Sequence, residues 1–268
     1  MNRADRAQIA QDTLNIFKQG YYCFGRSNIV CQNKFVSEFF TEEQLEQLEM
    51  PERKNAPVYE VVNESVVKTI GRVGSNSCGV LNFASAKNPG GGFLNGALAQ
   101  EEALAISSDL YNAQLEIGEY YERNRKSNTA LYTHNMIYSG NITFIRDSNL
   151  GLLKTPVNAN VLTSPAVNAG AYYRYEKGGK AKVLITMEKR IRYILKLFAA
   201  KKDATVVLGA YGCGVFGNDA NDVADIFHKV LGEERFEEFF EKIVFAVYDK
   251  EGKQYNIFKN KFLRQQKA

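Results

Sequence analysis

The stretch LNFASAKNPGGGFLNGALAQEE, residues 81–102, decides the fold of this chain. It starts as an apolar, strand-like run, breaks at three consecutive glycines, Gly90 to Gly92, and leads into a helical pattern. Three glycines in a row lose much backbone entropy on folding, and a plain turn does not need so many. The run therefore indicates close approach of the backbone to a ligand, with N–H groups and a helix N-terminus offered to an anion.

A second glycine-rich stretch, GAYGCGVFGN at residues 209–218, also follows a strand-like run and leads into a helical pattern. Two such loops favour a ligand with two phosphates. Residues 212–217 match the dinucleotide-binding pattern G-x-G-x-x-G, but the acidic residue expected about 20 positions later is absent. An NAD-dependent oxidoreductase is therefore a disfavoured alternative. Cys213 lies on this loop near a predicted helix N-terminus, a setting that can lower the pKa of a thiol.

Two adjacent carboxylates, Glu101 and Glu102, lie in the helix predicted over residues 97–111. Positions 98, 102, 106 and 110 form one i, i+4 row, in which Glu102 is the only polar residue. Burial on that row would favour the protonated carboxyl group that a general acid needs. Glu101 points about 100° away around the helix and would reach the same ligand from the side. The alternative is a solvated pair that complements the helix dipole.

The overall composition limits the class of protein. The chain has 268 residues, of which 45% are hydrophobic, enough for one large α/β domain with an appendage. Its net charge of +4 suits an anionic ligand and does not indicate nucleic-acid binding. No apolar run approaches the ~18 residues of a membrane span. Four scattered cysteines and two histidines indicate no metal site, and we expect reduced thiols, a cytoplasmic protein and no cofactor.

The pattern along the chain predicts a helical extension, residues 1–55, and a second domain, residues 56–268. The extension contains a helix over 4–19 and another from Thr41 to Met50, and a polar linker follows at 51–57. In the second part, strand-like runs occur at 58–62, 79–83, 130–138, 142–145, 158–163, 205–209 and 243–248, with helical patterns at 97–111, 186–201 and 219–231. This alternation predicts an α/β fold with a mixed, largely parallel sheet covered on both faces. Residues 139–141 are the predicted turn of a hairpin.

These motifs together resemble the microbial branch of the poly(ADP-ribose) glycohydrolases. The triple glycine followed, after seven residues, by Gln100-Glu101-Glu102 is similar to the signature of that family. Further similar blocks, LYTHNMIYS, VLTSPAVNAG and LGAYGCGVFGNDANDVA, follow in the expected order. The resemblance implies a three-layer α/β/α macrodomain, an N-terminal helical extension and an ADP-ribose ligand.

The resemblance also assigns roles to residues. It implies that Glu102 acts on the ribose–ribose glycosidic bond, that Glu101 holds ribose hydroxyl groups, and that Phe216 packs near the distal ribose. The implied substrate-binding residues are Asn88, Gly90, Gly91, Gly92, Gln100, Gly212, Cys213, Gly214, Val215, Phe216 and Asn218.

The sequence therefore predicts an enzyme that releases ADP-ribose from poly(ADP-ribose), mainly at chain ends, with Glu102 as general acid and base. Its partners would be ADP-ribose, its polymer and ADP-ribosylated macromolecules, without direct binding of nucleic acid or membrane. Two alternatives use the same pocket: a hydrolase that removes single ADP-ribose groups from protein or nucleic acid, and a non-catalytic ADP-ribose-binding macrodomain. The Gln-Glu-Glu motif argues against the second, because binding alone does not require an acid.

Overall fold

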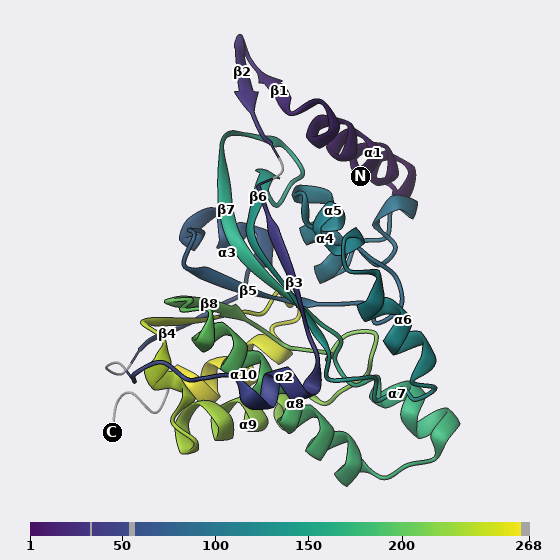
Figure 1. The fold of residues 1–268 in the computed structure, drawn as a ribbon, viewed down its shortest axis with the longest axis vertical. Coiled ribbons are helices and arrows are strands. Elements are labelled where there is room, and N and C mark those ends of the chain that lie inside the picture. The colour runs from purple at the N-terminus through teal and green to yellow at the C-terminus, as the bar shows by residue number, and fades with distance from the viewer. Residues whose placement is uncertain (33, 54–56, 264–268) are drawn as a thin grey trace.

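A seven-stranded mixed sheet forms the centre of the computed structural model, which describes residues 1–32, 34–53 and 57–263 (Figure 1). In spatial order its strands are β3 (Val36–Phe40), β6 (Met136–Arg146), β7 (Leu152–Ser164), β5 (Cys78–Phe83), β8 (Thr205–Leu208), β9 (Lys242–Ala246) and β4 (Val58–Val62). The strands from β7 to β4 are parallel, whereas β6 and β3 pair antiparallel at one edge. The predicted mixed, largely parallel sheet is confirmed.

Helices cover both faces of this sheet. Successive side chains of a strand point to opposite faces, so Val206 and Leu208 pack in one core cluster and Val207 in the other. The first face is covered by α2 (Glu42–Gln47), α8 (Lys180–Ala200), α9 (Ala220–His228) and α10 (Lys253–Leu263). The second is covered by α3 (Val66–Val73), α4 (Gln100–Ser107) and α5 (Leu110–Leu115). The three-layer α/β/α prediction is therefore confirmed.

The remaining helices are short and lie in the connections. They are η1 (Phe93–Asn95), α6 (Gly118–Lys126), α7 (Ala169–Ala171), η2 (Tyr172–Glu176), η3 (Lys229–Glu233) and η4 (Phe236–Phe239). The helix predicted over 97–111 is divided between α4 and α5, and α2 ends at Gln47 rather than at Met50. No helix in the described ranges is long and apolar enough to cross a membrane.

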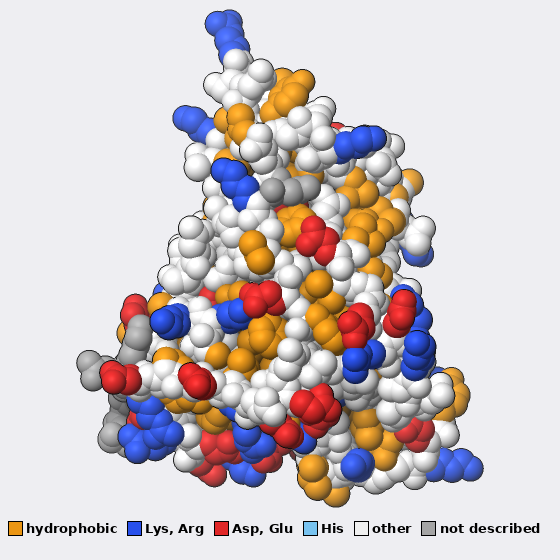
Figure 2. Space-filling view, viewed as in Figure 1, with side chains coloured by type: hydrophobic (Ala, Val, Ile, Leu, Met, Phe, Trp, Pro, Cys, Tyr) orange, Lys and Arg blue, Asp and Glu red, His pale blue; other side chains and the backbone are white. Residues whose placement is uncertain are grey.

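The N-terminal region begins with the predicted helix, α1 (Arg3–Gln19), which ends at Gly20 with a φ of 82°. It also contains three strands that the sequence analysis did not predict. Strands β1 (Tyr21–Phe24) and β2 (Ser27–Val30) form a hairpin that projects from the molecule, with a basic side chain at its tip (Figure 2). Strand β3 joins the central sheet. The domain boundary near residue 55 stays a prediction, and residues 54–56 of the predicted linker lie outside the described residues.

The hairpin predicted within residues 130–145 is wrong. Residues 130–135 form no strand, and β6 runs without interruption from Met136 to Arg146. The Gly-Asn pair that suggested a turn lies at a β-bulge instead, where Asn141 has a φ of 61°. The backbone N–H of Asn141 donates to Oδ1 of Asn160 at 2.9 Å, so a side chain from β7 supports the bulge. Turn-forming residues suit both structures, because each needs a left-handed backbone conformation.

Candidate active site

The side chain of Gln100 fixes the start of α4 against the carboxyl end of β5. Its Oε1 accepts from the backbone N–H of Phe83 at 2.8 Å, and its Nε2 donates to the carbonyl of Leu81 at 2.7 Å. The hydrogen-bonded pairing between β5 and β8 ends at Val80. Gln100 therefore bonds the main chain of β5 just beyond that point, at Leu81 and Phe83. The motif Gln-Glu-Glu therefore begins with a residue that positions the other two.

Glu101 is the buried carboxylate of the pair, with 3% of its surface exposed. Its Oε2 accepts from the backbone N–H of Ser85 at 2.7 Å, and its Oε1 accepts from Asn82 at 3.2 Å and Gln114 at 3.0 Å. Burial raises the pKa of Glu101 to about 7, against the opposing effect of these hydrogen bonds. Asn82, Gln114 and Thr163, all fully buried, form the polar surroundings of this carboxyl group.

Glu102 is only half-buried, so its position on the apolar row does not carry it into the core. Of that row, Ile106 and Leu110 are buried, but Leu98 is 52% exposed. The helix is rotated so that Glu101 enters the core in the first turn. Both oxygens of Glu102 accept backbone hydrogen bonds, Oε1 from Gly92 at 3.0 Å and Oε2 from Ala99 at 2.9 Å.

Gly91 lies directly against both carboxyl groups. A Cβ atom on this residue would stand 2.4 Å from Oε1 of Glu102 and 3.2 Å from Oε2 of Glu101. Its φ of 60° also favours glycine. The close backbone approach predicted from the triple glycine is therefore present, and its partners here are the two carboxylates.

The N–H groups of the first glycine loop all have protein partners. Gly90 donates to Oε1 of Gln114 at 2.8 Å, Gly91 to the carbonyl of Asn88 at 3.1 Å, and Gly92 to Glu102. This differs from the expectation that these groups face a phosphate. The residue that links the loop to Glu101, Gln114, was not identified from the sequence. Its signal was a lone amide in an otherwise apolar helix face.

The second glycine loop has a closed base and an open tip. The Nδ2 of Asn218 donates to the carbonyls of Val167 at 2.7 Å and Gly212 at 3.0 Å, which closes the base. At the tip, Val215 is 91% exposed. The N–H groups of Gly214, Val215 and Phe216 have no hydrogen-bond partner within the described ranges. This tip can therefore donate several hydrogen bonds to an anion.

Two expectations for the second loop are corrected. The N-terminus of α9 is capped by Asp219, whose side chain accepts from the N–H groups of Asn221 and Asp222, so this helix end already faces a carboxylate. Burial raises the pKa of Cys213 to about 12, and the charges of Asp219 and Asp222 act in the same direction. Cys213 is therefore no activated thiol. Phe216, from the same loop, lies 6.0 Å from Tyr132 between ring centroids.

A cavity of about 610 Å³ opens at the carboxyl ends of β4, β5, β8 and β9. Its walls include Asn63, Phe83, Gln100, Ala210 and Val247, so it reaches the start of α4. Ligands of open α/β sheets bind at this edge. The cavity neither contains the two glutamates nor reaches the tip of the second loop, and so offers room beside them for one end of a longer ligand.

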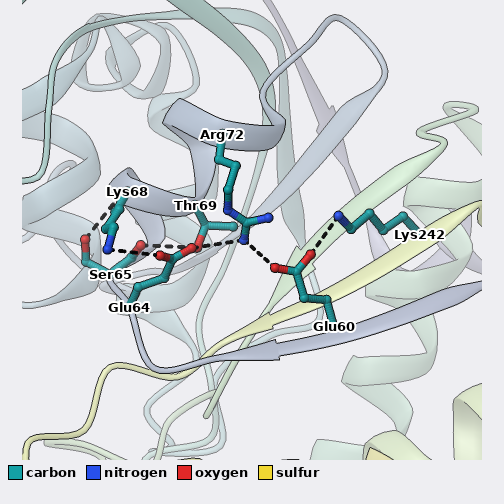
Figure 3. A network of polar contacts seen from close by, with 7 residues as sticks. All are labelled: Glu60, Glu64, Ser65, Lys68, Thr69, Arg72 and Lys242. Carbon is teal, nitrogen blue, oxygen red and sulfur yellow. Dashed lines mark hydrogen bonds and ion pairs between the residues drawn. The ribbon is translucent and has the colours of Figure 1, made fainter. Parts of the chain in front are cut away.

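An ion-pair network fixes one wall of this cavity (Figure 3). Arg72 of α3 bonds Oε1 of Glu64 at 3.0 Å and Oε1 of Glu60 at 2.6 Å, and Glu60 also bonds Lys242 at 2.6 Å. The network ties the last turn of α3, and Glu64 just before the helix, to strands β4 and β9. No cluster of three or more metal-binding side chains occurs among the residues described.

The three-layer architecture, the two glycine loops and the cavity at the carboxyl edge of the sheet together define a macrodomain-like protein with a paired-glutamate site. The chain belongs to the microbial-type poly(ADP-ribose) glycohydrolase family, whose catalytic-domain model matches residues 10–147. The resemblance predicted from the sequence motifs is confirmed.

Solved structures of bacterial poly(ADP-ribose) glycohydrolases are similar to this chain over most of its length. The enzyme from Thermomonospora curvata is 31% identical, with a TM-score of 0.88, and the match covers 97% of this chain and all of that one. Its complex with the inhibitor ADP-HPD gives 30% identity and a TM-score of 0.85 over the same shares of the two chains. The Deinococcus radiodurans enzyme in complex with ADP-ribose is 38% identical, with a TM-score of 0.79, over 85% of this chain and 94% of that one. A search of curated protein sequences gave no match.

Proposed function

We propose that this protein hydrolyses the ribose–ribose O-glycosidic bonds of poly(ADP-ribose) and releases ADP-ribose, mainly from chain ends. The observation that carries the proposal is the pair of carboxyl groups held against Gly91, beside a glycine loop with free N–H groups at its tip. Family membership supports it, as do the bacterial relatives solved with ADP-ribose and with ADP-HPD.

The ligand would lie across three parts of the site. The adenosine end suits the cavity at the carboxyl ends of the strands, where apolar side chains such as Phe83 and Val247 alternate with polar ones such as Asn63 and Gln254. The diphosphate suits the tip of the second loop, where three successive N–H groups can surround its oxygens. The distal ribose then reaches Glu101 and Glu102, with Phe216 and Tyr132 on the outer side.

Glu102 would act as the general acid and then as the general base. It gives its proton to the 2′-oxygen that leaves as the C1″–O bond breaks, while the distal ribose becomes oxocarbenium-like. The resulting carboxylate then takes a proton from the water that attacks C1″, which restores Glu102. The substrate's own diphosphate stabilises the positive charge on the ribose. Glu101 would hold the ribose hydroxyl groups.

The supporting roles divide along the chain. We propose that residues 56–268 form the ligand-binding domain and that residues 1–55 brace it. Arg3 and Arg6 of α1 donate to the carbonyls of Asn95 and Gly96 at 2.7 Å and 2.8 Å, just beyond the triple glycine. A cytoplasmic location is part of the proposal, because the four cysteines are unpaired and a reducing compartment keeps thiols free.

The test is release of ADP-ribose from purified poly(ADP-ribose) by the wild type and by Glu102→Gln. We expect release by the wild type, a loss of at least about 1,000-fold in the variant, and retained ADP-ribose binding by calorimetry. Equal turnover by both proteins would refute the role of Glu102. Release from mono-ADP-ribosylated protein or DNA but not from polymer would favour the mono-ADP-ribosyl hydrolase. Binding without hydrolysis of any linkage would indicate a non-catalytic protein.

A further inference from the structure

A basic and aromatic surface adjoins the second glycine loop. It is formed by the segment YYRYEKGGKAK, residues 172–182, which contains the π-helical turn η2 and the start of α8. Tyr173 is 42% exposed and Tyr175 is 74% exposed, and the guanidinium of Arg174 stands 5.9 Å from the centre of the Tyr175 ring. Figure 2 shows basic and hydrophobic side chains together over this corner of the molecule. We call it the Tyr–Arg surface.

The Tyr–Arg surface is joined to the second loop by direct contacts. The N–H of Gly170, just before η2, donates to the carbonyl of Phe216 at 3.0 Å. A small cavity of about 170 Å³ lies between the two parts, with Tyr173 on one side and Gly217 and Asn218 on the other. The Tyr–Arg surface therefore borders the second loop on the side of Phe216 and Gly217.

The charge of the Tyr–Arg surface is positive. Arg174, Lys177 and Lys182 are exposed and form no ion pair with the described residues, while Lys180 pairs with Asp222 at 2.7 Å. The one acidic residue of the segment, Glu176, is also exposed, and its carboxylate accepts from Thr129 Oγ1 at 2.7 Å and from the N–H of Ala130. The segment therefore keeps a net positive charge, and the two hydrogen bonds of Glu176 anchor the turn that presents the cations. Single π-helical turns occur frequently at functional sites.

We propose that the Tyr–Arg surface binds the ADP-ribose unit on the leaving side of the scissile bond, so that the protein recognises a polymer rather than only its terminal unit. This inference rests on the proposed function. The oxygen that leaves belongs to the adenosine of the next unit, which carries one adenine and a diphosphate. An exposed tyrosine provides a stacking face for the adenine, and the arginine and lysines provide charge for the phosphates.

The experiment measures equilibrium binding of long poly(ADP-ribose) and of free ADP-ribose in the non-hydrolysing Glu102→Gln background. The test variant adds Arg174→Ala and Tyr175→Ala. The matched control adds Phe24→Ala and Arg26→Ala in the β1–β2 hairpin, which also removes one exposed aromatic ring and one exposed arginine. We expect about tenfold weaker polymer binding and a smaller salt dependence in the test variant alone, with unchanged ADP-ribose affinity. The same two changes in the wild-type background should raise KM for polymer and leave kcat unchanged.

Several outcomes would overturn the inference: unchanged polymer binding in the test variant, an equal loss in the hairpin control, or an equal loss of ADP-ribose binding. Equal binding of a single-stranded RNA or DNA oligonucleotide of matched charge, lost in the same variant, would assign the surface to nucleic acid and also overturn it. Failure of the proposed function is distinguishable, because the wild type would then release no ADP-ribose whatever its polymer affinity. A selective loss of polymer binding would support the surface even in that case.

Discussion

The two glycine-rich loops differ in how the protein holds them. In the first, every N–H of Gly90 to Gly92 bonds to the protein, and the glycines let the backbone lie against Glu101 and Glu102. In the second, only the base is closed by the protein, and the tip at Val215 faces solvent. Glycine-rich loops therefore serve two purposes in one site. One holds the acids, and the other can receive the anion.

The largest effect that would test this difference is expected for Gly91→Ala. The new Cβ would collide with Glu102, at 2.4 Å from its Oε1, and the φ of 60° would be strained. Because displacement of a reacting group by about 1 Å can cost ~100-fold, we expect at least that loss of turnover. The measurement is kcat on poly(ADP-ribose). Gly25→Ala in the β1–β2 hairpin is the matched control, since Gly25 also has a φ of 60° but a Cβ there meets no atom within 4 Å, and it should keep its kcat within about threefold of the wild type. A similar loss in both variants would break the comparison.

The next effect concerns stability and the residue Gln114. Gln114→Leu removes the acceptor of the Gly90 N–H and one donor to Glu101, and leaves a buried N–H unpaired. We expect the free energy of unfolding to fall by about 2 kcal/mol, measured by urea denaturation. Asn218→Ala, which opens the base of the second loop, should cost only about 1 kcal/mol, because its site is half-buried and open to water. A larger loss of unfolding free energy in Asn218→Ala than in Gln114→Leu would contradict the view that the protein holds the first loop more tightly than the second.

Charge at the tip of the second loop should affect binding alone. Val215→Asp places a carboxylate where we expect the diphosphate, and at low salt we expect the Kd for ADP-ribose to rise about tenfold. Val215→Asn is the control of equal shape and should bind almost as the wild type does. Calorimetry gives both values, and melting temperatures should stay unchanged because the side chain is 91% exposed. Equal affinities of the two variants would place the anion elsewhere.

The smallest expected effect is on the pH dependence of stability, which should differ between Glu101 at the first loop and Asp219 at the second. The pKa of Glu101 is raised from 4.5 to about 7 by burial, so between these values the unfolded chain loses a proton that the folded chain keeps. Stability from Glu101 is thus complete below about pH 4.5 and is lost as the pH rises through 7. Glu101→Gln should flatten the fall in unfolding free energy over that window.

Asp219, beside the second loop, should show the opposite sign. Its pKa lies below 3.8, first because of the backbone hydrogen bond from Asp222. Its contribution is present above that value and is lost as the pH falls further. Asp219→Asn should therefore change stability at neutral pH and lose its effect in acid. Both expectations are tested by measuring the free energy of unfolding of Glu101→Gln and Asp219→Asn from pH 3 to 8. An identical pH profile for the two variants would contradict them.

Much of the fold was predictable because apolar runs identify buried strands. The run at 58–62 coincides with β4, and the helix that ends at Gly20 was placed within one residue. Strands β1, β2 and β3 were missed, because most of their side chains are exposed and their pairing depends on distant partners such as β6. The Gly140-Asn141 pair was interpreted as a turn because local sequence does not distinguish a turn from a bulge.

The site was predictable to the level of its motifs but not of its geometry. The sequence identified both glutamates and both loops, yet it did not show that Glu101 is the buried member of the pair. The rotation of α4 about its axis is set by packing of the whole helix and by the bonds of Gln100 to β5, which no single row of residues reveals. Asp219 belongs to the residue types that cap helix N-termini, but its role as the cap of α9 was not predicted from the sequence.

The contact between α1 and the first loop has a consequence for how the protein is made. Arg3 bonds the carbonyl of Asn95, a residue 92 positions later in the chain. At a synthesis rate of about 5 to 20 residues per second, the helix leaves the ribosome some 5 to 20 s before its partner does. Its apolar face, with Ala10 and Ile16, must remain uncovered for that time. The segment that completes the site is thus exposed to chaperones and proteases on every newly made chain.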